Sequence, residues 1–337
     1  MNAATAYGVR IVALQEFRIR LRTGRWRWLL LGWVVLLAAF TGLLDLSLST
    51  GYGFGNRDSQ RGVPLFGLLL IFVLGMVLVI SPALTSQAIN GDRERGTLAT
   101  LQVTTLRPME IALGKLAAGW GVGLTALALT LPFTGYAVIR GGVTISRIVV
   151  VYGVVALLIG AVCAISLALS AMLARTITST LLSYLVVTAL TVGTAVAFAF
   201  ALPVLAEPHS QRYPDGTEST YTEQRQDLVW WVLAPNPFVV VADAAPPVPP
   251  RRLGDDLNYY VDDYDVLSAI GRAVRDLRQP PGPLPVFPSG NPTDSASLPV
   301  WPYGLAFDLL LGAGAVAITA RRLRTPTRKL PPATRIA

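Results

Sequence analysis

The stretch that decides the fold reads GDRERGTLATLQVTTLRPMEIALGK and spans residues 91–115. It opens with four consecutive charged residues, Asp92, Arg93, Glu94 and Arg95, and a long apolar run lies on either side of it. Because a charged side chain costs several kcal/mol at bilayer depth, this segment is expected to lie outside the lipid. The flanking runs are expected to be membrane helices. Residues 87–115 are therefore predicted to form a short polar connector between two membrane helices.

The composition supports a membrane protein. The chain has 337 residues, of which 53% are hydrophobic and 14% are charged. Soluble domains carry about 25% charged residues. Since about 20 apolar residues suffice to cross a bilayer, the apolar runs predict an all-α polytopic fold with six transmembrane helices. Five of these helices are expected within residues 28–205, and the sixth at 301–320.

The charge distribution predicts the orientation in the membrane. The net charge of +8 hides basic clusters near both ends of the chain, each beside an apolar run. Nucleic-acid binding is one interpretation of such clusters, but the excess of basic residues in cytoplasmic segments explains them more simply. Both termini are therefore predicted to be cytoplasmic, with residues 321–337 forming a basic tail. The clusters consist of Arg10, Arg18, Arg20, Arg22, Arg25 and Arg27, and of Arg321, Arg322, Arg324, Arg328, Lys329 and Arg335.

Residues 1–27 are predicted to contain a basic amphipathic helix in the headgroup plane. Its apolar stripe recurs every three or four residues, at Tyr7, Ile11, Leu14, Phe17 and Leu21. The run that follows, residues 29–48, could be read as a signal peptide. It is long for one, however, and further apolar runs follow, which favours a retained first membrane helix.

Residues 206–300 differ from the rest of the chain and are predicted to form a large outer insertion between the fifth and sixth helices. They hold 15 of the 24 prolines and a net charge of 7 − 13 = −6. Within them, residues 228–245 are apolar but interrupted by two prolines. A seventh crossing there would place the basic tail outside, so a re-entrant or interfacial hairpin is favoured. A stripe from Leu267 to Leu277 is expected to form a helix that packs on this hairpin.

Motifs for chemistry are scarce. The sequence has no G-x-x-x-x-G-K-[ST] phosphate loop. A G-x-G-x-x-A match at Gly312, Gly314 and Ala317 falls in the sixth apolar run, where small residues favour helix packing. The single histidine and single cysteine, His209 and Cys163, cannot build a metal cluster. Acidic residues at 255–256, 262–263 and 265 could bind calcium, but a solvated acidic loop is the simpler interpretation. No catalytic, metal or cofactor site is predicted in this chain.

Two acidic residues fall inside the apolar runs, Asp45 and Asp308. A carboxylate inside a membrane helix is a functional candidate by default. Asp45 lies near the outer end of its helix, where it could simply face the membrane interface. Asp308 lies about two turns in from the outer end. It is a candidate for the substrate path, with pairing inside the helix bundle as the alternative.

The connector resembles the one between the second and third membrane helices of ABC-2 type transporter permeases. The matching residues are Glu94, Arg95, Gly96, Thr97, Leu98 and Leu101, followed by Glu110, Ile111, Gly114 and Lys115. Two departures are Ala99, where an acidic residue is common, and Thr105-Leu106-Arg107 in place of Pro-Leu-Ser. The resemblance implies an N-terminal interfacial helix, a separate ATP-binding subunit that holds ATP and Mg, and a second permease chain, either a copy or a paralogue.

We therefore interpret the connector as the coupling element that contacts the ATP-binding subunit. An exposed helix with charged and apolar sides is suited to dock into a partner protein. The expected function is the permease subunit of an exporter in the plasma membrane, acting on an amphipathic substrate and performing no chemistry itself. The alternatives are a non-transporting sensor or scaffold with a ligand-binding outer region, and an intramembrane enzyme. The coupling residues are predicted to be Arg93, Glu94, Arg95, Gly96, Thr97, Leu98 and Leu101.

Overall fold

The computed structural model describes residues 3–22, 25–50, 61–97, 106–212, 218–248, 251–252, 260–261, 265–279 and 298–324. Six helical segments within these residues are long and apolar enough to cross a membrane, which confirms the predicted all-α polytopic fold. They are Trp28–Ser49, Gly62–Glu94, Pro108–Ile139, Ile145–Met172, Thr176–Val204 and Trp301–Arg322.

The membrane segments are built from nine described helices, because some of the segments are interrupted and contain two helices. The third segment joins α6 to α7, and the fifth joins α9 to α10 through one π-helical turn, Ala189–Gly193. A further helix, α1, precedes them. Their bounds are α1 Ala3–Arg22, α2 Arg25–Ser49, α3 Gly62–Thr85, α4 Asn90–Glu94, α6 Pro108–Ala128, α7 Leu131–Ile139, α8 Ile145–Met172, α9 Thr176–Thr188, α10 Thr194–Val204 and α13 Trp301–Arg322.

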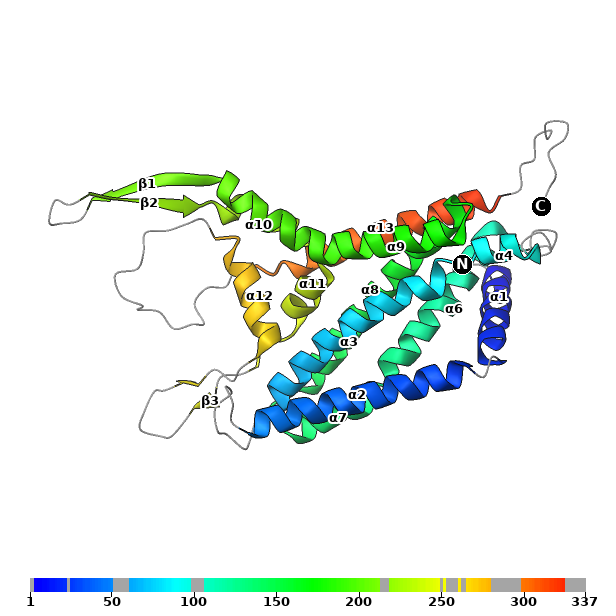
Figure 1. Cartoon of the computed structure of the whole chain (residues 1–337), viewed down its shortest axis with the longest axis horizontal. Helices are drawn as coiled ribbons and strands as arrows, with labels where there is room; N and C mark the ends of the chain where they lie inside the picture. Colours follow the sequence, from blue (N-terminus) through cyan, green and yellow to red (C-terminus); the bar gives the residue numbers. More distant parts are fainter. Residues whose placement is uncertain are drawn as a thin grey trace.

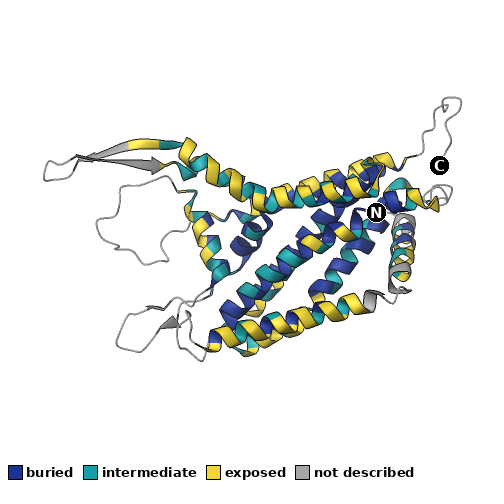
Figure 2. Ribbon diagram, viewed as in Figure 1, coloured by how far each residue is buried: buried dark blue, intermediate teal, exposed yellow. Residues whose placement is uncertain are grey.

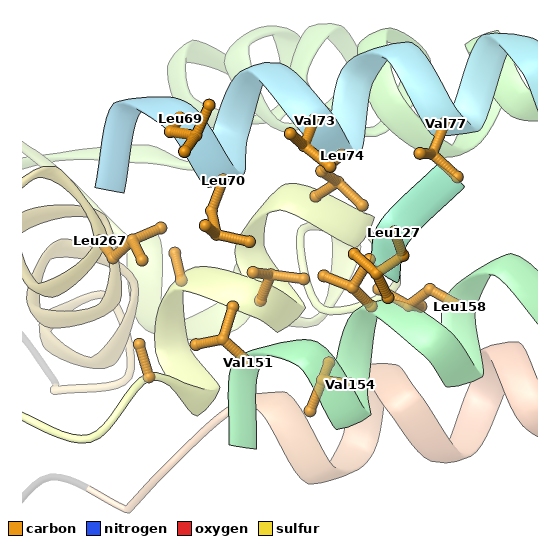
Figure 3. Close-up of a cluster of buried hydrophobic side chains, with 14 of the residues drawn as sticks. Leu69, Leu70, Val73, Leu74, Val77, Leu127, Val151, Val154, Leu158 and Leu267 are labelled. Atoms are coloured by element: carbon orange, nitrogen blue, oxygen red, sulfur yellow. The ribbon is translucent and has the colours of Figure 1, made fainter. Parts of the chain in front are cut away.

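The hydrophobic core lies between α3, α6 and α8. Leucine and valine side chains fill it, as Figure 3 shows for Leu70 and Val77 of α3, Leu127 of α6 and Leu158 of α8. Because these side chains recur every three or four residues on α3 and α8, each helix presents a continuous apolar face to the others. Both helices therefore lie in the centre of the bundle.

The outermost helices, α2 and the α9–α10 pair, bury little of their surface in this chain. Figure 2 shows exposed residues along both of them, whereas α3 and α8 are largely buried. The exposed side chains are mainly apolar, for example Leu43 on α2 and Leu181 on α9. An apolar outer surface suits contact with lipid, since hydrocarbon does not penalise it.

The outer insertion contains more regular structure than the sequence indicated. Two antiparallel hairpins, which the composition did not predict, form from β1 (Ala206–Arg212) with β2 (Glu218–Gln224) and from β3 (Arg251–Arg252) with β4 (Tyr260–Val261). Between the hairpins, residues 228–245 include the 3₁₀ turn Trp230–Val232 and the helix α11, Pro237–Ala244. An earlier 3₁₀ turn covers Gln226–Leu228. That residues 228–245 re-enter the bilayer stays a prediction.

Helix α12, Val266–Asp276, packs against α11 as the apolar stripe predicted. Leu267 and Val274 of that stripe are buried, and Val274 joins Val239 and Val300 in a small apolar cluster. Figure 1 places α11, α12 and the β1–β2 hairpin together at one end of the bundle. The start of α1, the end of α13 and α4 lie at the opposite end.

Two buried acidic residues fasten this insertion to the membrane helices. Asp265 accepts hydrogen bonds at 2.7 and 2.8 Å from Nη2 of Arg147 on α8. Asp243 of α11 accepts hydrogen bonds from the backbone amides of Val300 and Trp301, at 2.6 and 2.7 Å, and so satisfies free N–H groups at the start of α13. The insertion is thus anchored to α8 and α13 by charged contacts that the apolar pattern does not reveal.

Candidate functional site

The predicted connector is held tightly against the end of the bundle. Helix α4 follows α3 after a turn, and the backbone amides of Ile89 and Asn90 both donate to Oγ of Ser170, each at 3.1 Å. Ser170 lies in the last turns of α8. Ile89 is fully buried in an apolar cluster with Ile111 and Leu167. These contacts fix α4 to the ends of α6 and α8.

A buried lysine ties the connector to two further elements. The ammonium group of Lys115, on α6, forms salt bridges with both Asp92 of α4 and Glu16 of α1. The Lys115 side chain is 0% exposed, whereas those of Asp92 and Glu16 are 13% and 21% exposed. Arg95 Nη2 completes the group by donating to the second oxygen of Asp92 at 3.0 Å. The two positive charges therefore offset the two negative ones.

The rest of the described connector faces away from the bundle. Glu94, Arg95, Gly96 and Thr97 are exposed, and α4 is visible at the extreme end of the molecule in Figure 2. Gly96 has a positive φ of 70°, a conformation that favours glycine. Arg93 is partly buried. Leu98 and Leu101, the predicted apolar contacts, lie outside the described residues.

Glu94 has a second contact within the chain. Its Oε1 accepts a hydrogen bond of 3.4 Å from the backbone amide of Thr176, the first residue of α9. A carboxylate at the start of a helix is favourable because it faces unsatisfied N–H groups and the positive end of the helix dipole. The connector therefore contacts α9 as well as α6 and α8.

The residues Glu110 and Gly114 on α6 form the docking face for α1. An added Cβ at Gly114 would lie 2.5 Å from Cβ of Val12, and one at Gly8 would lie 2.6 Å from Oε2 of Glu110. Glu110 also accepts a 3.0 Å hydrogen bond from the amide of Arg107 at the start of α6. The close approach of the two helices thus requires glycine at position 114, whereas a side chain at position 8 would displace the end of the Glu110 side chain.

Helix α1 presents three residues of its predicted apolar stripe outward, whereas Phe17 is half-buried near Gly121 of α6. Tyr7 is 68% exposed, and Ile11 and Leu14 are also exposed. The face that packs on α6 consists instead of Gly8, Val12 and Glu16. Figure 1 shows α1 running across the end of the bundle, steeply inclined to α2. An exposed apolar stripe on a helix with this orientation fits the interfacial position that the sequence predicts.

Asp308, the predicted substrate-path residue, is buried within α13. Its exposed fraction is 3%, and neither carboxylate oxygen has a hydrogen-bond partner among the described residues. Gly312, one turn further on, lies close to Ala161, because an added Cβ would be 3.2 Å from the Cα of that residue. Asp308 thus lies on the face of α13 that packs closely on α8. The alternative, pairing within the bundle, finds no partner among the described residues.

Asp45 is paired instead with the third segment. Its carboxylate accepts hydrogen bonds from Tyr136 Oη at 2.9 Å and from Arg140 Nε at 3.1 Å. In the outer insertion, Asp227 forms a similar pair with Arg225, and the hydrogen bond from that guanidinium lowers the pKa of the Asp227 carboxyl group. Both pairs are partly exposed and have an evident structural role.

The remaining candidates have structural contacts or fall outside the described residues. Within the described ranges, no three His, Cys, Asp or Glu residues gather as a metal site would require. Asp265 is paired with Arg147, and residues 255–256 and 262–263 are not described. Cys163 is fully buried in the core. Of the G-x-G-x-x-A match, Gly312 packs on α8 as the helix-packing interpretation predicted, whereas Gly314 and Ala317 are exposed on α13.

Sequence reasoning missed Lys115 and Glu16 as partners. A signal was present, because Lys115 is an isolated charge at the edge of an apolar run and Glu16 is the sole acidic residue among the N-terminal arginines. The i, i+4 spacing of Glu110 and Gly114, and of Ile111 and Lys115, also places each pair on one side of α6. Neither signal indicates which acidic residue contacts Lys115.

Six helices that are long and apolar enough to cross a membrane, with a charged connector exposed at one end of the bundle, fit a multi-pass membrane protein. The sequence family described as ABC-2 family transporter protein matches residues 10–243. Because that match covers more than half of the chain, the protein belongs to this family and is a permease component of an ABC transporter. Curated proteins include none that matches the chain.

Proposed function

We propose that this chain is the permease subunit of an ATP-driven exporter. It works with a separate ATP-binding subunit, which holds ATP and Mg and carries out hydrolysis, and with a second permease chain that is either a copy or a paralogue. The assembly lies in the plasma membrane with both termini of this chain in the cytoplasm. The observation that carries the proposal is the exposed, charged connector fixed to the ends of several membrane helices in a member of the ABC-2 family.

The connector is the contact for the ATP-binding subunit in this proposal. Arg93, Glu94 and Arg95 supply charged contacts, Gly96 lies in the turn after α4, Thr97 follows that turn, and Leu98 and Leu101 supply apolar contacts. The contacts of α4 with α6, α8 and α9 support this role, because a push on the connector reaches three membrane segments directly. Closure of the ATP-binding subunits would then move the bundle between inward-open and outward-open states.

The substrate path is proposed to include Asp308. An unpartnered buried carboxylate is unfavourable, so its presence supports a role in function. The surrounding helices are otherwise apolar, which supports an amphipathic substrate taken from the cytoplasm or the inner leaflet.

The decisive experiment pairs this chain with the ATP-binding subunit encoded beside it. We expect the two to copurify and to hydrolyse ATP faster together than the ATP-binding subunit does alone. Substituting Glu94→Arg reverses one exposed charge on the connector and should weaken both complex formation and ATP turnover. Arg140→Gln, which removes a charge at the opposite end of the bundle, is the matched control. Unchanged binding and turnover in Glu94→Arg would instead favour the sensor or scaffold function.

The proposed orientation is tested separately with single cysteines. After Cys163 is replaced by alanine, a cysteine at Ser219 in β2 should react with an impermeant thiol reagent added to intact cells. A cysteine at Thr327, in the basic tail, should react only after the membrane is opened. Labelling of both positions from the same side would refute the six-helix topology with cytoplasmic termini.

A further inference from the structure

The strongest unexplained feature of the described residues is the ion cluster around Lys115. Its side chain is completely buried, yet its ammonium group contacts carboxylates from two elements that are far apart in sequence. Glu16 lies 99 residues before it and Asp92 lies 23 residues before it. Removing one partner of a buried ion pair is strongly unfavourable, because the other charge is left without compensation. The cluster therefore constrains all three elements at once.

The residues of α1 that contact α6 lie on one face of the helix. Gly8, Val12 and Glu16 are spaced by four residues, so they lie on one side of the helix. Gly8 lies against Glu110, Val12 packs against Gly114 of α6, and Glu16 reaches Lys115. The side with Tyr7, Ile11 and Leu14 is exposed and apolar. One face of α1 thus contacts the ion cluster while another is available to the membrane surface.

We propose that Lys115 is a positioning residue that joins the connector to α1, so that the two move as one unit. A displacement of Asp92 changes its distance to Lys115, and Glu16 transmits that change to α1. Because the exposed apolar stripe of α1 is available to the membrane surface, a displacement of the connector is passed on to a helix at that surface. The inference rests on the proposed function only in that the connector receives the motion of the ATP-binding subunit.

The test uses the purified full-length chain in lipid nanodiscs, without any partner. Spin labels on cysteines at Tyr7 of α1 and Arg93 of α4, in a Cys163→Ala background, report the distance between α1 and the connector. A second label pair, at Met109 of α6 and Arg93, reports the distance between α6 and the connector. Met109 and Tyr7 are both exposed.

Glu16→Gln should replace the single narrow α1–connector distance with a broad distribution. The α6–connector distance should stay narrow in that variant, because the salt bridge between Asp92 and Lys115 remains. Lys115→Met should broaden both distances. Arg140→Gln removes a partly exposed ion pair elsewhere and should change neither distance. A merely local structural role for Lys115 would not produce this selective pattern.

An α1–connector distance that stays narrow in both Glu16→Gln and Lys115→Met overturns the proposal. If Lys115→Met fails to fold, Glu16→Gln alone decides, because Glu16 is the most exposed member of the three-residue cluster. Copurification with the ATP-binding subunit is a separate measurement, so failure of the proposed function is distinguished from failure of this inference. In that complex, Glu16→Gln should preserve binding and ATP hydrolysis while lowering transport.

Discussion

Replacing Arg147 with methionine should loosen the outer insertion from the bundle. The guanidinium group donates to both oxygens of Asp265, and through Nη1 to the carbonyl oxygen of Pro246 at 2.8 Å. The two charged side chains are 1% and 4% exposed. Without Arg147, the Asp265 carboxylate stays buried with no compensating charge. Breaking such a pair from one side costs about 3–5 kcal/mol.

Hydrogen exchange of the α12 backbone amides measures the free-energy cost of losing the Arg147–Asp265 pair. Each 1.4 kcal/mol changes an equilibrium about tenfold, so the protection of amides in 266–276 should fall by about 100-fold or more. Amides in the half of α8 nearer the connector, residues 159–172, should keep their protection. Arg140→Gln is the control, since the Arg140 and Asp45 side chains are 35% and 19% exposed. It should cost about 1 kcal/mol or less.

A second variant separates the lost charge pair from other effects of the substitution. Arg147→Met combined with Asp265→Asn removes both charges and should recover most of the lost protection. The reasoning is refuted if α12 in Arg147→Met exchanges within about tenfold of the unmodified protein, a change of only about 1.4 kcal/mol. It is also refuted if the double variant is less protected than the single one.

Two further predictions concern the helix contacts of the candidate site. Gly114→Leu should separate α1 from α6, because even a Cβ at that position would lie 2.5 Å from Val12. The expected loss of stability is about 1–3 kcal/mol. Limited proteolysis should therefore cleave α1 earlier than in the unmodified protein. A Cβ added at Gly153 would lie in open space, so Gly153→Leu should leave the cleavage of α1 unchanged. Asp308→Leu should raise the free energy of unfolding by about 1–3 kcal/mol, because it replaces a buried polar group that has no partner among the described residues with an apolar side chain of similar shape. Thermal unfolding in detergent measures this, and a lowered melting temperature would contradict it.

The membrane helices could be predicted from the sequence because the bilayer imposes one strong rule on all of them. An apolar run of sufficient length must be helical, and charges must mark its ends. The fifth segment illustrates this, since 29 residues between Thr176 and Val204 form one span despite a π-helical turn within it. The ends of these helices are therefore determined by which residues are favourable in lipid and which in water, and not by contact with a particular neighbouring residue.

The contacts between elements could not be predicted in the same way. Nothing in the sequence distinguishes Arg147 from an ordinary charge beside an apolar run, yet its partner lies 118 residues further along the chain. Lys115 similarly matched a family motif without indicating that Glu16 lies opposite. Such pairing depends on three-dimensional proximity, and one sequence contains many acidic residues that could serve equally well. The β1–β2 hairpin was missed for a different reason, because its strands are polar throughout and show no alternation of apolar residues.

The hydrogen bonds from Val300 and Trp301 to Asp243 have a consequence for biogenesis. The ribosome completes α11 well before it begins α13, because 57 residues separate Asp243 from Val300. The start of the sixth membrane segment therefore binds a carboxylate that was synthesised earlier. A translation product that ends before residue 300 would lack both amides that bind Oδ2 of Asp243, whereas Arg275 would still pair with the other oxygen. A chain with a misfolded α11 would lack this contact at the start of its last membrane segment.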